Sequence, residues 1–399
     1  MYLIEIGVRG VYQAQRIALA GRRGGCLVLA GVIGLSFGCA SGMTTSGGRA
    51  RVTPGSFRLP APTGPASVGT RVLMLVDKSR IDPFDPRHRH RRLMIQIWYP
   101  AASGAPRAAY MAKGVGRIYA AEYRLPGGTF ARVRTNAYRN ARPLERPGGY
   151  PAILFSPGYG VPHALYSSLL EDLASHGFVV IALDHTYETD AVEFPGGRIV
   201  RRNLPPDLGR NGGPTSYRLL LRIIGQRVAD VRFLRRSLPA LDERLGHIID
   251  PERVGVFGHS LGGLTAASAL EADRALGAGV DLDGSIFGPG VRRPLARPFM
   301  IMTEHGDGTL LRFWPRLRGA RLFVRIDGTR HLNYSDWNVL APWLQRTGVR
   351  LPTLGAIKAA RALRIVRAYI DAFFARHLGE AAAPLLDSPS PFPEVHLMR

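Results

Sequence analysis

The chain has 399 residues and a formal net charge of +23 at pH 7, which is enough length for one large domain with a substantial core. The charge is almost entirely arginine, since Lys78, Lys113 and Lys358 are the only lysines, and this skew indicates GC-rich codon usage. The arginines are dispersed apart from a cluster at residues 87–92, and no nucleic-acid-binding motif is present, so we expect no nucleic-acid partner.

Both cysteines, Cys26 and Cys39, lie in the first forty residues, which excludes thiol chemistry and disulfides from the rest of the chain. An arginine pair followed by an apolar run over residues 26–37 predicts a signal peptide over residues 1–40 and therefore an exported protein. Cleavage after Ala40 would release a secreted protein, whereas lipidation of Cys39 would anchor a lipoprotein. Residues 41–68, rich in Ser, Thr, Gly and Pro, predict a flexible linker.

Strands and helices alternate over residues 69–380, which predicts one domain with a mostly parallel central sheet and helices on both faces. Residues 102–149 lack a clear period and predict an insertion over the sheet edge that acts as a lid. A polar stretch over residues 195–214 predicts a loop, and residues 381–399 a loose tail. Strands are predicted at 71–76, 93–100, 152–155, 178–183, 254–258, 278–283, 299–302 and 322–326, and helices at 165–173, 217–238 and 357–378.

The segment from Gly258 to Gly262 has the pattern G-x-S-x-G, with an apolar strand before it and a helix-forming stretch after it. This is the nucleophile elbow of an α/β-hydrolase, a sharp turn that exposes the hydroxyl of Ser260. Glycine is needed because a Cβ would collide where strand and helix pack closely. Residues 34–38 also fit the pattern, but they lie in the leader, where no such turn can form.

A serine hydroxyl needs a base, and the base needs a third group that orients it. In α/β-hydrolases the histidine follows the last strand, and His331 lies there. The acid is open by position. Glu304 and Asp307 follow the strand before that of the histidine, whereas Asp281 and Asp283 come from the strand after the nucleophile helix.

The oxyanion of the reaction needs two backbone N–H groups. Leu261, directly after the nucleophile, supplies one of them. The glycine-rich loop at residues 155–160 is expected to supply the other, because its glycines allow close approach of the backbone to a substrate.

These stretches together resemble the plasma and intracellular type II platelet-activating factor acetylhydrolases and their bacterial relatives. The resemblance covers residues 70–380 and rests on segments 95–100, 153–160, 172–179, 258–263 and 281–284 and the loop around His331. It implies Asp283 as the acid, Tyr159 and Leu261 as oxyanion donors, and a reaction without cofactor, metal or calcium. Pro157 departs from the family, where histidine often precedes the glycine.

The expected function is therefore that of an exported serine esterase with Ser260, His331 and Asp283 as its triad, acting on esters with short or modified acyl groups, including those on phospholipids. A lipase or cutinase-like polyester hydrolase is the enzymatic alternative. A non-catalytic surface binding protein on a hydrolase scaffold is another reading. The cluster at residues 87–92 predicts association with a membrane surface, and the sequence carries no signal for an oligomeric state.

Overall fold

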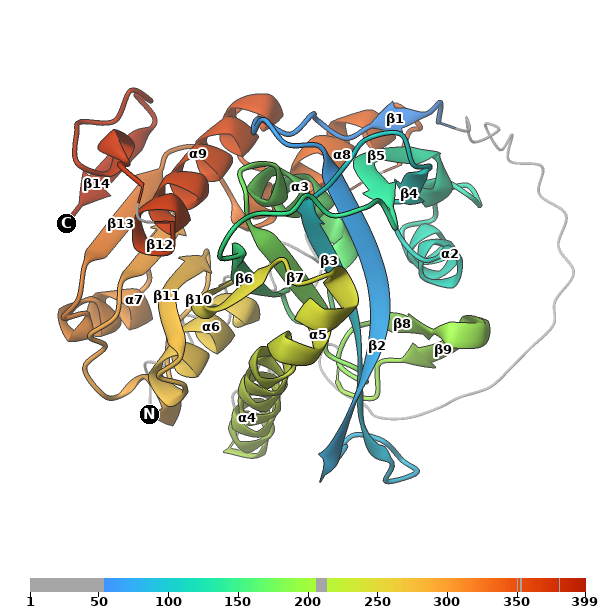
Figure 1. Ribbon diagram of the computed structural model, residues 1–399, viewed down its shortest axis with the longest axis horizontal. Coiled ribbons are helices and arrows are strands. Elements are labelled where there is room, and N and C mark those ends of the chain that lie inside the picture. The colour runs from blue at the N-terminus through green and yellow to red at the C-terminus, as the bar shows by residue number, and fades with distance from the viewer. Residues whose placement is uncertain (1–53, 206–213, 350, 352–353, 380) are drawn as a thin grey trace, which may run out of the picture.

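One large sheet forms the centre of the molecule (Figure 1). The computed structural model describes residues 54–205, 214–349, 351, 354–379 and 381–399. Within them, twelve strands form the sheet in the order β1-β5-β2-β3-β7-β6-β10-β11-β12-β13-β14, with β4 beside β5. The strands are β1 (Phe57–Arg58), β2 (Val68–Ile81), β3 (His90–Pro100), β4 (Arg107–Ala109), β5 (Val133–Arg139), β6 (Tyr150–Ser156), β7 (Val179–Asp184), β10 (Ile249–His259), β11 (Leu276–Leu282), β12 (Phe299–Thr303), β13 (Arg321–Ile326) and β14 (Val395–Met398).

The central strands β7, β6, β10, β11, β12 and β13 run parallel to one another. Every residue of β6 and β7 is buried, as expected for strands covered on both faces. Because the strands are parallel, their carboxyl ends meet at one edge of the sheet, and ligand-binding loops gather there.

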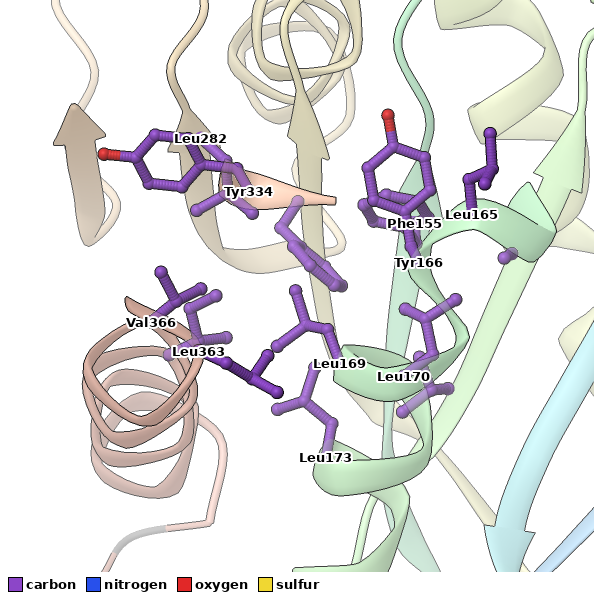
Figure 2. Close-up of a cluster of buried hydrophobic side chains, with 14 of the residues drawn as sticks. Phe155, Leu165, Tyr166, Leu169, Leu170, Leu173, Leu282, Tyr334, Leu363 and Val366 are labelled. Atoms are coloured by element: carbon purple, nitrogen blue, oxygen red, sulfur yellow. The ribbon is translucent and has the colours of Figure 1, made fainter. Parts of the chain in front are cut away.

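Helices cover both faces of the sheet, each over its own apolar core. One core contains side chains from α3, α8 and α9, and Figure 2 shows leucines of α3 and α9 turned toward each other beside Phe155 of the sheet. The other contains side chains from α4 to α7. This confirms the predicted fold class. The helices are α2 (Lys113–Glu122), α3 (Ser167–Ser175), α4 (Pro214–Arg236), α5 (Leu238–Leu245), α6 (Leu261–Ala272), α7 (Gly308–Phe313), α8 (Trp337–Gln345) and α9 (Ala359–His377).

The insertion at residues 102–149 forms β4, α2 and β5, and β5 extends the sheet beside β2 and β1. The hydroxyl of Tyr119 on α2 donates to the main-chain oxygen of Gly160, 3.0 Å away. The insertion therefore packs against the glycine-rich loop, while its motion as a lid stays a prediction. In place of part of the loop predicted for residues 195–214, an antiparallel hairpin forms from β8 (Ala191–Phe194) and β9 (Arg198–Arg201).

The predicted linker over residues 41–68 was wrong in its second half. Phe57 in β1 stacks on the Trp343 ring with centroids 5.2 Å apart, and Leu59 is 1% exposed. Two apolar side chains therefore hold this segment against the core. Its composition predicts a linker because the core residues that these side chains contact lie far away in the sequence. The predicted signal peptide, with Cys26 and Cys39, lies outside the described residues.

The predicted loose tail over residues 381–399 was also wrong. Its last strand, β14, pairs antiparallel with β13 and closes that edge of the sheet. Glu394 accepts hydrogen bonds from Arg361 on α9 at 2.9 Å, and Val395 is buried. A four-residue strand at the end of a proline-rich stretch carries too weak a local pattern to be predicted.

Candidate active site

Ser260 occupies a strained turn between β10 and α6, at the carboxyl edge of the sheet. Its φ of 59° and ψ of −122° lie in a region that costs a non-glycine residue free energy and is typical of functional sites. A Cβ on Gly258 would lie 2.2 Å from the Gly262 carbonyl carbon, and a Cβ on Gly262 would lie 1.9 Å from the Ser156 oxygen. Glycine is therefore required at both positions.

His331 and Asp283 form a hydrogen-bonded pair, with 2.7 Å between Nδ1 and Oδ2. Burial raises the pKa of the Asp283 carboxyl, but hydrogen bonds from His331 and Thr303 more than offset this effect and the net shift is downward. The carboxylate is thus ionised and accepts the Nδ1–H of His331. That tautomer leaves Nε2 of His331 as a proton acceptor.

Backbone contacts place Ser260 beside this pair. The N–H of Ser260 donates to the oxygen of Leu282, which directly precedes Asp283, at 2.9 Å. On its other side, the ring of His259 lies 4.4 Å from the ring of His331. The three side chains predicted from the sequence therefore come from neighbouring loops at one edge of the sheet.

The other acid candidates have different partners. Asp281 is fully buried and accepts from the Gly284 N–H, and burial raises the pKa of its carboxyl well above the usual range. Asp307 caps α7 through the N–H groups of the second and third helical residues. Glu304 accepts from the N–H of Gly328 at 2.9 Å. Among the described residues, Asp283 is the carboxylate bonded to His331.

The glycine-rich loop packs directly against the nucleophile turn. A Cβ on Gly158 would lie 3.6 Å from Cβ of Ser260, so the peptide that leads to Tyr159 lies beside the serine. Leu261 is the first residue of α6, and first-turn N–H groups have no acceptor within their own helix. Gly158 and Leu261 therefore both adjoin Ser260, and the roles of Tyr159 and Leu261 as oxyanion donors stay a prediction.

A hydrogen-bonded chain that sequence reasoning missed joins this loop to the histidine loop. The N–H of Gly158 donates to the Tyr166 hydroxyl at 3.2 Å, which lies 2.8 Å from Nδ1 of His259. Nε2 of His259 lies 2.9 Å from the main-chain oxygen of His331. Burial lowers the pKa of His259 to about 3, so the ring is neutral, accepts from Tyr166 and donates to His331.

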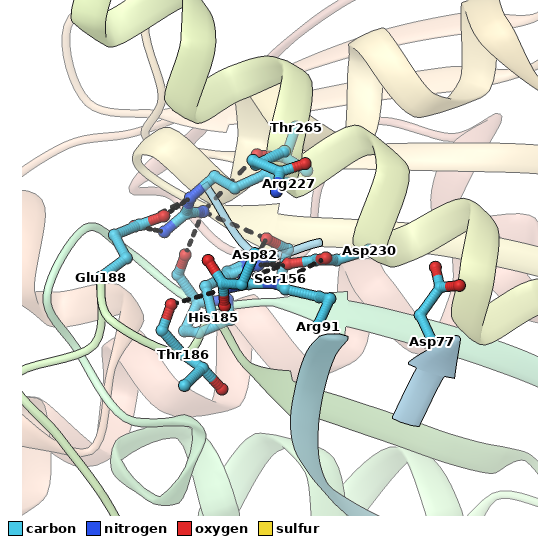
Figure 3. Close-up of polar contacts among 12 residues, drawn as sticks. Asp77, Asp82, Arg91, Ser156, His185, Thr186, Glu188, Arg227, Asp230 and Thr265 are labelled. Atoms are coloured by element: carbon cyan, nitrogen blue, oxygen red, sulfur yellow. Dashed lines mark hydrogen bonds and ion pairs between the residues drawn. The ribbon is translucent and has the colours of Figure 1, made fainter. Parts of the chain in front are cut away.

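A second missed group is the buried polar network of Figure 3. Arg227 on α4 contacts the loop at Pro157 and Gly158 and pairs with Glu188. Ser156, which accepts from Arg227, also lies 3.0 Å from Nε2 of His185. The network thus reaches the loop from the face opposite to Tyr166.

The arginine cluster at residues 87–92 is partly internal rather than a surface patch. Arg91 is buried and pairs with Asp230 at 2.6 Å and with Asp82 at 2.7 Å, while Arg89 pairs with Asp85 at 2.7 Å. Association with a membrane surface stays a prediction. No helix in the part of the chain that the structure describes is long and apolar enough to cross a bilayer.

One group of described residues approaches the spacing of metal ligands, namely Asp172, His176 and Asp371. Asp172 already accepts from the N–H of Thr63 at 2.7 Å and lies 3.2 Å from Nη1 of Arg367. A guanidinium at this distance opposes a cation. These contacts instead join the N-terminal segment to α3 and α9. They give a structural role to Asp172, the acid in the segment 172–179 on which the family resemblance partly rests.

Comparisons with known proteins agree with this architecture. The family model described as platelet-activating factor acetylhydrolase, isoform II, matches residues 52–194. A probable 1-alkyl-2-acetylglycerophosphocholine esterase of Arthroderma benhamiae is 26% identical over 390 residues, 86% of this chain and 94% of that protein. The platelet-activating factor acetylhydrolase of Bos taurus is 26% identical over 370 residues, 82% of this chain and 78% of that protein.

A solved structure of a ferulic acid esterase from Streptomyces cinnamoneus superposes with a TM-score of 0.72 at 32% identity, covering 86% of this chain and all of that one. The resemblance seen in the sequence and its expected enzyme class are confirmed by these likenesses. The chain has the α/β-hydrolase fold and resembles the platelet-activating factor acetylhydrolases, and it is a carboxylic ester hydrolase.

Proposed function

We propose that the protein is a serine esterase in which Ser260 is the nucleophile, His331 the base and Asp283 the acid. The observation that carries the proposal is the bonded His331–Asp283 pair beside a strained serine at the elbow. Serine is a poor nucleophile by itself, and this arrangement supplies both a base and a carboxylate that orients the base.

In the proposed reaction, Nε2 of His331 takes the Ser260 proton while Oγ attacks the ester carbonyl. The carbonyl oxygen becomes an oxyanion that accepts hydrogen bonds from the N–H groups of Tyr159 and Leu261. Asp283 stabilises the imidazolium of His331. Collapse breaks the bond to the alcohol, which leaves with the proton from His331. Water, deprotonated by His331, then attacks the acyl-enzyme and releases the acid and free Ser260.

We propose esters with short or modified acyl groups as substrates, with acetylated phospholipids as the lipid form. The names of the curated relatives support this class, and the family model spans the glycine-rich loop. A second candidate is an ester of an aromatic acid, favoured by the likeness to the ferulic acid esterase, which is covered over its whole length. Export stays part of the proposal, with residues 1–40 as signal peptide and with either a secreted protein or a lipoprotein anchored through Cys39 as the product.

The test compares the wild-type full chain with Ser260→Ala on p-nitrophenyl esters from acetate to laurate, an acetylated ether phospholipid and methyl ferulate. Turnover that is highest on acetyl esters and is abolished in the variant is the expected result. A preference for methyl ferulate would move the aromatic class to the front, and a preference for laurate or polyester films would favour the lipase or cutinase alternative. Equal turnover by Ser260→Ala would refute the serine mechanism.

A further inference from the structure

Arg227 holds two successive carbonyl groups of the glycine-rich loop. Its Nη1 donates to the oxygen of Pro157 at 2.9 Å, and its Nη2 donates to the oxygen of Gly158 at 3.3 Å. The side chain is fully enclosed, with 1% of its surface exposed. A buried guanidinium is costly unless each of its donors is satisfied, so these contacts fix the loop as well as the arginine.

The guanidinium is itself fixed by its remaining contacts. Nε lies 2.9 and 2.8 Å from the two carboxylate oxygens of Glu188, and Nη2 pairs with the same carboxylate. Nη1 also donates to Oγ of Ser156 at 3.2 Å and approaches Oγ1 of Thr265 at 3.5 Å. Thr265 in turn donates to the main-chain oxygen of Leu261, so the same group borders both predicted oxyanion segments.

Because peptide groups are planar, these contacts also determine the direction in which the predicted oxyanion donor points. In a planar trans peptide the C=O and the next N–H point in opposite directions. Since the oxygen of Gly158 points at Arg227, the N–H of Tyr159 points away from it. The preceding peptide obeys the same rule, because the oxygen of Pro157 points at Arg227 while the N–H of Gly158 points at the Tyr166 hydroxyl.

We propose that Arg227 is a positioning residue for the oxyanion hole, and that Tyr166 and His259 couple the loop it orients to the backbone of His331. The guanidinium sets the direction of the Tyr159 N–H, and the chain through Tyr166 keeps the base loop in register with it. The inference rests on the proposed function of Ser260 and His331. Without the clamp, the glycine-rich loop can rotate its peptides away from the reacting carbonyl.

The first test is Arg227→Lys, which keeps the positive charge beside Glu188 but cannot reach both carbonyls at once. Turnover of p-nitrophenyl acetate is measured per active site, counted with a fluorophosphonate. We expect kcat to fall about tenfold to a hundredfold, less than the hundredfold to thousandfold that loss of an oxyanion donor itself costs, with KM changed less than about threefold. The affinity for a trifluoromethyl ketone, whose adduct carries the oxyanion, falls by a similar factor.

Arg367→Lys is the matched control. Arg367 is also a buried arginine that pairs with an aspartate, Asp172, and donates to main-chain oxygens, but it does not touch the glycine-rich loop. A purely structural role for Arg227 predicts that both variants lose thermal stability while kcat per active site stays within threefold of wild type. That result for a folded Arg227→Lys overturns the proposal.

If Arg227→Lys does not fold, Tyr166→Phe decides. This variant keeps the ring and removes the hydroxyl that accepts from Gly158 and contacts His259, so a lower kcat with nearly unchanged KM is expected. Unchanged kcat per active site in Tyr166→Phe overturns the coupling. Ser260→Ala distinguishes a failure of the proposed function from a failure of the positioning role. An active Ser260→Ala refutes the serine mechanism itself. If Ser260→Ala is inactive while the Arg227 and Tyr166 variants keep the kcat of wild type, only the positioning role is refuted.

Discussion

Nε2 of His259 lies 2.9 Å from the main-chain oxygen of His331, and the two rings lie 4.4 Å apart. The residue directly before the nucleophile thus holds the backbone of the proposed base. Burial, the largest influence, lowers the pKa of His259 to about 3, so this ring stays neutral over the range in which an esterase works. It acts as a fixed donor and acceptor while His331 gains and loses a proton.

His259→Phe removes both hydrogen bonds and keeps a ring of similar size. We expect kcat to fall about tenfold, the equivalent of one net hydrogen bond, with a smaller change in KM. The control is His90→Phe, an exposed position in β3, whose kinetic constants should equal those of wild type. Wild-type kcat in His259→Phe would contradict the role assigned to the ring.

The same substitution changes the acid stability. Because folding lowers the pKa of His259 from its ordinary value of 6.5 to about 3, the unfolded chain binds one more proton between these limits. Its contribution to the unfolding free energy is therefore lost as pH falls from about 6.5 toward 3. Denaturant titrations of His259→Phe should show a shallower loss over this range, and an unchanged slope would contradict the assignment.

Asp283→Asn is expected to lower kcat by about four orders of magnitude, because an amide favours the wrong tautomer of His331. Asp281→Asn is the matched change two residues earlier, within β11, which Asp283 directly follows. Burial raises the pKa of the Asp281 carboxyl well above its usual range, which favours the neutral form that an asparagine resembles, so kcat should stay near wild type. A large loss in Asp281→Asn with little loss in Asp283→Asn would reverse the assignment of the acid.

Asp281→Asn also carries a stability prediction of opposite sign to that of His259. A carboxyl whose pKa is raised by folding favours the folded state at low pH, and that contribution disappears as pH rises above the ordinary range near 3.8. At neutral pH the variant should therefore unfold at a temperature equal to or above that of wild type. Scanning calorimetry at neutral pH measures this, and a marked decrease would contradict a raised pKa for Asp281.

Thr303→Val tests the support of the acid. The Thr303 hydroxyl donates to Oδ1 of Asp283 and helps to hold the pKa of that carboxyl down. Its removal raises the pKa of Asp283, so the acid limb of the kcat/KM profile should move to higher pH. Superposable wild-type and variant profiles would show that the hydroxyl has no influence on the pair.

Two glycine-to-alanine substitutions, one at the elbow and one within an ordinary helix, should have opposite effects on stability. Gly262→Ala places a Cβ 1.9 Å from the Ser156 oxygen, a main-chain atom that cannot move aside, so soluble active protein should be lost. Gly225→Ala in α4 meets nothing within 4 Å and should stabilise the fold by about 0.5–1 kcal/mol. Thermal unfolding and turnover of the two variants measure the contrast, and a fully active Gly262→Ala would contradict the close packing at the elbow.

The sequence predicted Ser260 and His331 because each lies next to a strand with a strong local pattern. The acid stayed open by spacing, since Asp281 lies in β11, Asp283 directly follows that strand, and the next strand ends near two more carboxylates. In the structure, the hydrogen bond to His331 distinguishes Asp283 from the other three carboxylates. For β1 and β14, the pairing partners lie far along the chain, and a short strand has little pattern of its own.

The position of Arg227 in the sequence is itself unusual. It stands in the apolar stripe of the long helix between Ile223, Ile224 and Val231, where a charge must find a buried partner. The helix pattern predicts that such a partner exists. It cannot predict that Glu188 and the oxygens of the glycine-rich loop fill this role, because those groups come from other elements.

The most direct test of the serine mechanism is to trap its covalent intermediate. Wild-type protein and Ser260→Ala are quenched in acid during turnover of p-nitrophenyl acetate, and the intact mass and the modified peptide are determined by mass spectrometry. The account predicts one added acetyl group on wild-type protein, located at Ser260, and none on the variant. Acetylation at another residue, or turnover that persists in Ser260→Ala, would contradict it.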